Sequence, residues 1–358
     1  MLKEHFSVFA PICIQCKRTT LEEHALVLQV ARKEGVHIEE GHLFCPSCKK
    51  IYPILHGIPI LVPNPEEYIR QSVLHLTQTY PASPFFDQWL SQACGPSSDY
   101  ELTKHYLSTY MWAHYNDLHP EKKESDDSNL KMIIQEMLNP CLFEGPQIDI
   151  GCSVGRGTFD LAHATQNLTL GLDINFSMLR MAQKIQRTGV VSYHLRQSGT
   201  MYKSCSYPIS LPSAKLVDFW AVDAHHLPFP DKHIHRCHST NLIDCLENPA
   251  DHIKELARVH NHFGYISIAT PFDWSPNATP YENWIGGHSP MYPLGGDPIQ
   301  NLRWYFSKQS PIESMRDVEI IQDQENIPWR IRIHNRSVMH YNLHLISVRR
   351  KDGLSSTC

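Results

Sequence analysis

The sequence predicts an α/β fold in which a mostly parallel, doubly wound sheet is covered by helices on both faces. Three observations lead to this prediction. From residue 147 onward, short apolar runs alternate with segments of helical periodicity, which is the pattern of a parallel α/β sheet. A glycine-rich loop follows the first of these runs. Two Cys-x-x-Cys pairs precede this region and indicate a separate small metal-binding unit.

Changes in pattern divide the chain into three predicted domains. Residues 1–65 hold both cysteine pairs and end in a proline-rich segment, which is a natural boundary. Residues 66–145 show helical spacing of apolar side chains, for example at Leu102 and Tyr106, and we expect a helical connector or cap there. Residues 146–358 form the α/β region.

Within the α/β region, five parallel strands and a terminal antiparallel pair are expected. Asn248 and Pro249 predict the start of the helix before the fifth strand, because Asn caps helices and Pro suits the first turn. His260 falls on the inner face of that helix, and Gly264 predicts its end. The expected strands are 148–150, 168–172, 216–222, 234–240, 265–269, 329–333 and 341–348, and the other expected helices are 157–164 and 177–187.

Composition limits the classes of function. The chain has 32 Lys and Arg against 37 Asp and Glu, a formal charge of −5, so no overall positive field would gather nucleic acid and no nucleic-acid partner is expected. No apolar run approaches the roughly 18 residues of a membrane span, so no membrane partner is expected either. The eleven cysteines are odd in number and mostly scattered, which fits a reducing, cytoplasmic location. Nothing in the sequence indicates an oligomeric state.

The two cysteine pairs, Cys13 with Cys16 and Cys45 with Cys48, are separated by 28 residues. Each pair can form a tight knuckle, and two knuckles supply the four thiolates of a closed tetrahedral zinc site. Four protein ligands leave no open coordination position. We therefore expect a structural Zn²⁺ ion and not a catalytic one.

The loop between the first strand and its helix reads Asp149-Ile-Gly151-Cys-Ser153-Val-Gly155-Arg-Gly157. Glycines let the backbone approach a ligand closely, and the helix N-terminus favours negative charge. The spacing differs from the Gly-x-Gly-x-x-Gly of dinucleotide-binding proteins. Carboxylates then end the next two strands, where Asp173 can accept from both ribose hydroxyls and Asp223 can bind an adenine amino group. The expected cofactor-binding residues are Asp149, Gly151, Ser153, Gly155, Asp173, Ile174, Asp223, Ala224 and Asn241.

This combination of loop and acids resembles class I S-adenosylmethionine-dependent methyltransferases over residues 146–270. The resemblance implies a Rossmann-like fold with antiparallel terminal strands, and S-adenosylmethionine as the cofactor. Ser153 stands where many members of that class have glycine.

Two further phrases resemble known families. After the second cysteine pair, Tyr-Pro-Ile-x-x-Gly-Ile-Pro at 52–59 resembles the zinc ribbons that activate tRNA and translation-factor methyltransferases, a similarity that covers about the first 63 residues. The segments 241–246, 271–287 and 327–332 resemble the C-terminal methyltransferase module of ovothiol-biosynthesis enzymes. That module is assigned to N-methylation of a thiol-substituted histidine, although this chain lacks the sulfoxide synthase that precedes it there.

The predicted activity is transfer of a methyl group to a small-molecule nucleophile, with an imidazole-bearing amino acid suggested by the last resemblance. Direct displacement needs mainly positioning and exclusion of water. The expected catalytic residues, just past the fourth strand and in the loop after the fifth, are Asn241, Asp244 and Glu282. The expected substrate-binding residues are Asp273, Trp274, Trp284 and Arg332, because rings and acids suit a planar, partly cationic acceptor and Arg332 can hold a carboxylate.

The sequence leaves several alternatives open for the function and for the roles of individual residues. The zinc ribbon can instead grip a macromolecule in an RNA or protein methyltransferase, and a scaffold that binds cofactor without turnover is a third possibility. His225 or His226 can serve as a general base beside the cofactor. The aromatic residues Tyr106 and Tyr110 can cap the cofactor or simply form helix core.

Overall fold

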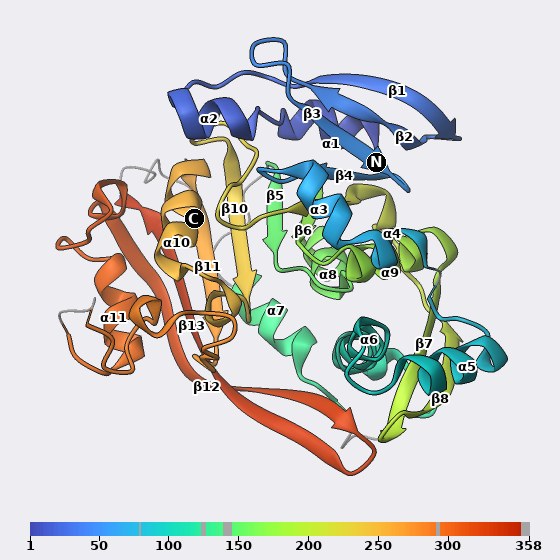
Figure 1. Cartoon of the computed structure of the whole chain (residues 1–358). Coiled ribbons are helices and arrows are strands. Elements are labelled where there is room, and N and C mark those ends of the chain that lie inside the picture. The colour runs from blue at the N-terminus through green and yellow to red at the C-terminus, as the bar shows by residue number, and fades with distance from the viewer. Residues whose placement is uncertain (79, 123–126, 139–144, 291–293, 352–358) are drawn as a thin grey trace.

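The computed structural model describes residues 1–78, 80–122, 127–138, 145–290 and 294–351. Its main feature is an eleven-stranded sheet in the order β1-β2-β3-β4-β9-β6-β5-β10-β11-β13-β12, and β7 and β8 form a separate two-stranded sheet (Figure 1). The strands from β4 to β11 in this order run parallel, whereas β13 is antiparallel to both β11 and β12. The predicted α/β class with antiparallel terminal strands is confirmed.

The N-terminal region contributes four strands to this sheet. Apolar β4 is buried, and it pairs in parallel with β9 through Ile60 opposite Ala221 and Leu61 opposite Val222. The cysteine-bearing unit is therefore continuous with the main sheet, a connection that the sequence did not indicate. Its elements are α1 (Lys3–Phe9), α2 (Ile14–Thr20), β1 (Val27–Glu34), β2 (His37–Phe44), β3 (Ile51–Leu55) and β4 (Ile58–Leu61).

The connecting region is helical in the part that the structure describes. Side chains at Asn64, Ser83 and Ser98 cap three of its helices by accepting hydrogen bonds from backbone amides of the first turn. Residues 121–129 are charged and poor in apolar side chains, as expected of a solvated loop, and they lie partly outside the described residues. The helices are α3 (Pro65–Gln71), α4 (Val73–Thr77), α5 (Pro84–Cys94), α6 (Asp99–Tyr115), η1 (Asn116–Leu118) and α7 (Leu130–Leu138).

The α/β region follows the predicted alternation of strands and helices. One helix boundary is different: α10 ends at Val259, and His260 and Gly264 lie inside strand β11. A Cβ atom at Gly264 would lie 1.8 Å from the carbonyl oxygen of His235, so this glycine permits a close approach between strands and does not end a helix. The elements are β5 (Gln147–Ile150), α8 (Arg156–Thr165), β6 (Thr169–Asp173), α9 (Phe176–Thr188), β7 (Val190–Ser198), β8 (Met201–Pro208), η3 (Ala214–Leu216), β9 (Val217–Val222), β10 (Ile234–Thr240), η4 (Ile243–Cys245), α10 (Pro249–Val259), β11 (His260–Thr270), η5 (Tyr281–Asn283), α11 (Pro298–Tyr305), η6 (Glu313–Met315), β12 (Val318–His334) and β13 (Ser337–Arg350).

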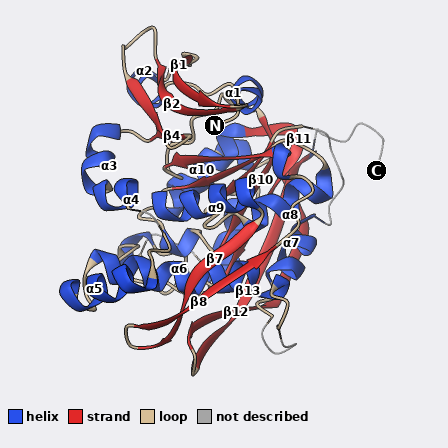
Figure 2. Ribbon diagram, turned by 90° about the vertical axis from the view of Figure 1, so that its right-hand side faces the viewer, coloured by secondary structure: helices blue, strands red, loops and turns tan. Residues whose placement is uncertain are grey.

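Helices pack against the sheet (Figure 2), and two apolar cores lie on its two faces. Alternate residues of a strand enter opposite cores, as Trp220 and Phe219 do in β9. On one face, α1, α10 and α11 pack, and on the other, α6, α7, α8 and α9 pack. No helix among the described residues is long and apolar enough to cross a membrane. The doubly wound arrangement brings the carboxyl ends of β5, β6 and β10 to one edge, where ligands bind in such folds.

Candidate active site and metal centre

The glycine-rich loop after β5 turns sharply before α8. Gly151 and Gly155 have φ values of 76° and 85°, in the left-handed region that glycine adopts without strain. A Cβ atom at Gly155 would lie 2.7 Å from the ring of Phe219, so a larger residue does not fit there. Ser153 also has a positive φ, 53°, which explains why glycine would suit this position. The loop thus presents its backbone to the space above the sheet.

Asp173 at the end of β6 holds this loop. Its carboxylate accepts hydrogen bonds from the backbone amides of Ser153 and Asn175, each at 2.8 Å. Burial raises the pKa of Asp173, although the amide hydrogen bonds act in the opposite direction. Ile174, the next residue, is 51% exposed at the rim, and its carbonyl accepts from the hydroxyl of Tyr68 at 2.7 Å.

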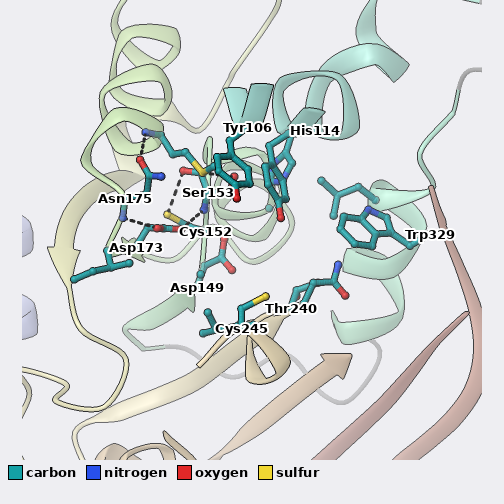
Figure 3. A pocket seen from close by; sticks show the side chains of 18 of the residues that line it. Tyr106, His114, Asp149, Cys152, Ser153, Asp173, Asn175, Thr240, Cys245 and Trp329 are labelled. Carbon is teal, nitrogen blue, oxygen red and sulfur yellow. Dashed lines mark hydrogen bonds between the residues drawn. The ribbon is translucent and has the colours of Figure 1, made fainter. Parts of the chain in front are cut away.

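A cavity of about 280 Å³ opens at this edge of the sheet (Figure 3). Of the predicted cofactor-binding residues, the cavity brings together Asp149, Gly151, Ser153, Asp173, Ile174 and Asn241. Aromatic side chains from the helical region and β12 form another part of its lining, namely Tyr106, Tyr110, His114 and Trp329. None of the described residues that line the cavity is Lys or Arg. The cavity therefore combines carboxylates with flat apolar walls.

Asp149 lies at the base of this cavity and is 4% exposed. Its carboxylate accepts a hydrogen bond from the hydroxyl of Thr158 at 2.7 Å. Burial raises the pKa of Asp149 to about 6. A buried carboxyl group with only one hydrogen-bonding partner lowers the stability of the fold. Such groups are common at functional sites.

Asp223 and Ala224, predicted to contact adenine, do not line the cavity. Asp223 accepts from both the backbone amide and Nδ1 of His225, at 2.9 and 2.7 Å. Nε2 of His225 accepts in turn from the amide of Asn248, the cap of α10. His225 is thus held by an acid and a helix terminus, and the hydrogen bond between its Nδ1 and Asp223 raises its pKa.

Past β10, the chain presents Asn241 and Asp244. Asn241 has a φ of 52° and lines the cavity, and its buried Oδ1 has no hydrogen-bonding partner among the described residues. Asp244 is 3% exposed; its Oδ2 accepts from the amide of Asp273 at 2.8 Å, whereas Oδ1 has no partner in the described chain. Burial raises the pKa of Asp244 to about 6. Its neighbour Cys245 lines the cavity, so Asp244 lies at the edge of the cavity.

The predicted substrate residues lie in the loop after β11, apart from Arg332 on β12, and none of them lines the cavity. Trp274 and Trp284 stack with ring centroids 6.2 Å apart, and Nε1 of Trp284 donates to the carbonyl of Thr279. Glu282 lies on η5 at the surface. Arg332 lies near the turn between β12 and β13, where Nη2 donates to Oδ1 of Asn335 at 2.5 Å.

Asp273 connects this loop to the cavity wall. Its Oδ2 accepts from the hydroxyl of Tyr341 at 2.9 Å, and the Tyr341 ring stacks on Trp329 at 5.4 Å. Sequence reasoning assigned no role to either aromatic residue, because they lie in strands remote in sequence from the glycine-rich loop. The sequence placed Trp329 in an expected strand, and the resemblance over 327–332 included it, but neither indicated that it lines the cavity.

The four predicted metal ligands come together. The Sγ atoms of Cys13, Cys16, Cys45 and Cys48 all lie within 4.8 Å of one another. The Sγ atoms of Cys13 and Cys48 are 3.5 Å apart and those of Cys16 and Cys45 are 3.8 Å apart. Four sulfurs at about 2.3 Å from a tetrahedral zinc ion lie about 3.8 Å from one another, so the cluster fits such an ion. The hydroxyl of Tyr52 lies 3.5 Å from Sγ of Cys13.

Solved structures resemble the chain only distantly. One described for conversion of a disulfide bond into a thioacetal group during echinomycin biosynthesis has 16% identity and a TM-score of 0.39, covering 63% of this chain and 82% of that chain. Haemonchus contortus phosphoethanolamine N-methyltransferase 2 has 12% identity and a TM-score of 0.38, covering 74% and 60%. A chain in a complex that contains the Haloferax volcanii Trm112 methyltransferase activator has 14% identity and a TM-score of 0.35, covering 62% and 89%. Similarity at this level indicates no acceptor.

No curated protein matches the chain. A family model described as a methyltransferase domain matches residues 148–268, which run from β5 through the glycine-rich loop and Asp173 to β11. The match covers the glycine-rich loop, Asp173 and the segment after β10, which line one side of the cavity, and it shows that the chain contains a methyltransferase domain of the S-adenosylmethionine-dependent kind.

Proposed function

We propose that the cavity beside Asp173 binds S-adenosylmethionine and that the enzyme methylates a small, planar nitrogen nucleophile. The observation that carries this proposal is the lining itself, in which carboxylates and aromatic rings occur without Lys or Arg among the described residues. Such a lining favours a neutral or cationic planar acceptor over a phosphate or carboxylate group. The resemblance to ovothiol-biosynthesis modules supports an imidazole-bearing amino acid.

Several residues would hold the cofactor. Asp173 would accept from the ribose hydroxyls, and the backbone of Gly151 and Ser153 would face the amino-acid part. Asp223 and Ala224 are proposed to contact the adenine, although they do not line the cavity. The bound cofactor supplies an electrophilic methyl group on a sulfonium sulfur.

The acceptor would then lie between this cofactor site and the loop after β11. Oδ1 of Asn241 lacks a partner in the described chain and can accept an N–H of the acceptor. Asp244, whose pKa is raised to about 6, can take the proton that the nitrogen releases. Further out, Asp273 and Glu282 would attract a cationic group, with Trp274 and Trp284 as stacking surfaces.

We also propose that Zn²⁺ occupies the cluster of four cysteines as a structural ion. Four thiolates leave no coordination position for a substrate. A cluster of reduced thiolates suits a reducing compartment such as the cytoplasm.

A panel of small acceptors tests the proposed substrate class. Formation of S-adenosylhomocysteine is measured with imidazole-bearing amino acids, other planar amines and, as a contrast, carboxylic and phosphate acceptors. Turnover should be confined to the planar nitrogen acceptors and should fall in Asn241→Ala. Turnover confined to carboxylic or phosphate acceptors would contradict the proposed class.

A further inference from the structure

A second cavity of about 280 Å³ lies between the N-terminal unit and α9, apart from the residues that line the first. Figure 1 shows α4 and α9 side by side beneath β2 and β4 at this junction. Its volume is several times the roughly 30 Å³ that a water molecule occupies in the liquid, so it has room for a polyatomic ligand. Its polar lining comes from β2, the β3–β4 turn, the segment after α4, and α9.

Two cations on α9 face this cavity without an acidic partner. Arg180 donates through Nη1 to the carbonyls of Leu76 and Gln78, at 3.2 and 2.6 Å, and Nζ of Lys184 donates to the carbonyl of Tyr80 at 3.2 Å. Neither forms an ion pair within the described part of the chain. Burial lowers the pKa of both groups, and the charge of Arg180 lowers that of Lys184 further. Both cations would be stabilised by an added anion.

The acidic group of the cavity is already paired. Glu39 on β2 is 5% exposed, and Oε1 accepts from Nη2 of Arg187 at 2.5 Å. This pair hardly offsets the charges of Arg180 and Lys184. The cavity is thus left with a net positive charge.

An amide donor completes the lining. Gln183 is 8% exposed, and it lines the cavity. A Cβ atom at Gly57 would lie 2.9 Å from Nε2 of Gln183 and 2.8 Å from Nη2 of Arg187, so both donors meet at the N-terminal unit. Nε2 of Gln183 is thus a hydrogen-bond donor beside the two cations.

We propose that this cavity binds a phosphate group, either as free phosphate or as a small phosphomonoester, through Arg180, Lys184 and Gln183. Charge-assisted hydrogen bonds from these donors would satisfy the oxygens of such an anion. The site lies on α9, whose N-cap Asn175 and first-turn residue Met178 line the cofactor cavity. The assignment does not depend on the identity of the methyl acceptor.

Calorimetric titration of the full chain with inorganic phosphate and with glycerol phosphate, at constant ionic strength, tests the proposal. Saturable binding at one site is expected. Lys184→Gln and Gln183→Leu should each weaken it by about tenfold, the effect of one lost hydrogen bond to a charged group. Lys203→Gln removes the same charge from exposed β8 and should leave the affinity unchanged. Arg180 is not varied, because it also anchors the chain after α4.

Tighter binding of glycerol phosphate identifies an ester as the ligand, and equal or tighter binding of phosphate identifies the free anion. S-adenosylhomocysteine should not displace either probe, because the two cavities have separate linings. The proposal is overturned if neither probe binds saturably, if affinity is the same in wild type, Lys184→Gln and Gln183→Leu, or if S-adenosylhomocysteine displaces the anion.

Discussion

The carboxylate of Asp173 accepts a hydrogen bond of 2.8 Å from the backbone amide of Ser153, which joins the end of β6 to the glycine-rich loop after β5. Ser153 holds a left-handed φ of 53° at that point, so the loop is fixed in a conformation that favours glycine. One acid thus orients the loop and also lines the cavity.

Replacing Asp173 with alanine should weaken binding of S-adenosylhomocysteine by on the order of a hundredfold, because two charge-assisted hydrogen bonds to the ribose are lost. Calorimetry on the purified variant measures this. Asp317→Ala is the matched control, since Asp317 is exposed and outside the cavity. Wild-type affinity in Asp173→Ala would contradict the proposed position of the ribose.

Asp149→Asn should make stability less dependent on pH. The folded pKa of Asp149 is raised from 3.8 to about 6, so the acid form is favoured in the fold and stability is lost as pH rises from 3.8 through 6. The asparagine of the variant cannot ionise. Between pH 3.5 and pH 8, the difference in free energy of unfolding between the variant and the wild type should therefore shift by up to about 3 kcal/mol in favour of the variant. Urea unfolding over this pH range tests the prediction, and a pH-independent difference would refute it.

If Asp244 accepts the proton, activity should depend on its ionisation. The pKa of Asp244 is raised to about 6, so kcat/KM should rise with pH through about 6 and then level off. Asp244→Asn should lower kcat by about 10²- to 10⁴-fold and remove this limb of the profile. A limb that persists unchanged in the variant assigns the ionisation to another group.

Removal of the metal should loosen β4 together with the cysteine unit. Purified protein should contain about one zinc ion per chain, and chelation should unfold the metal-binding unit because the ion supplies much of its folding free energy. Since Ile60 and Leu61 pair with β9, hydrogen exchange should become faster at Ala221 and Val222 as well.

Cys16→Ser should reproduce this loss of protection without chelator. Cys94→Ser, which changes an exposed cysteine outside the cluster, should not. Folded protein that contains no metal when purified without chelator would argue against the zinc site.

Short sequence motifs predicted the helix cap of α10 and the cysteine cluster correctly. The side chain of Asn248 accepts from the amide of Asp251, so the predicted cap of α10 is confirmed. The four cysteines likewise lie together, as their spacing indicated. The cap depends on residues that are close in sequence, and metal binding is the usual role of paired Cys-x-x-Cys motifs.

Long-range contacts were not accessible to the same reasoning. The role of Gly264 depends on the carbonyl of His235, which lies on the neighbouring strand. The pairing of Ile60 with Ala221 joins segments about 160 residues apart, and the β7–β8 hairpin between α9 and β9 was missed because its strands are short of buried apolar side chains. Trp329 reaches the cavity only through the long antiparallel pair at the end of the chain.

The fate of a labelled methyl group distinguishes a small-molecule acceptor from RNA or protein. The purified enzyme is incubated with methyl-labelled S-adenosylmethionine and a cell extract that is then separated into low-mass, RNA and protein fractions. We expect a labelled low-mass product that separates from S-adenosylmethionine itself, and loss of this product with Asp173→Ala. Label that accumulates in RNA or protein, with no labelled low-mass product other than the cofactor, would rule out a small-molecule acceptor.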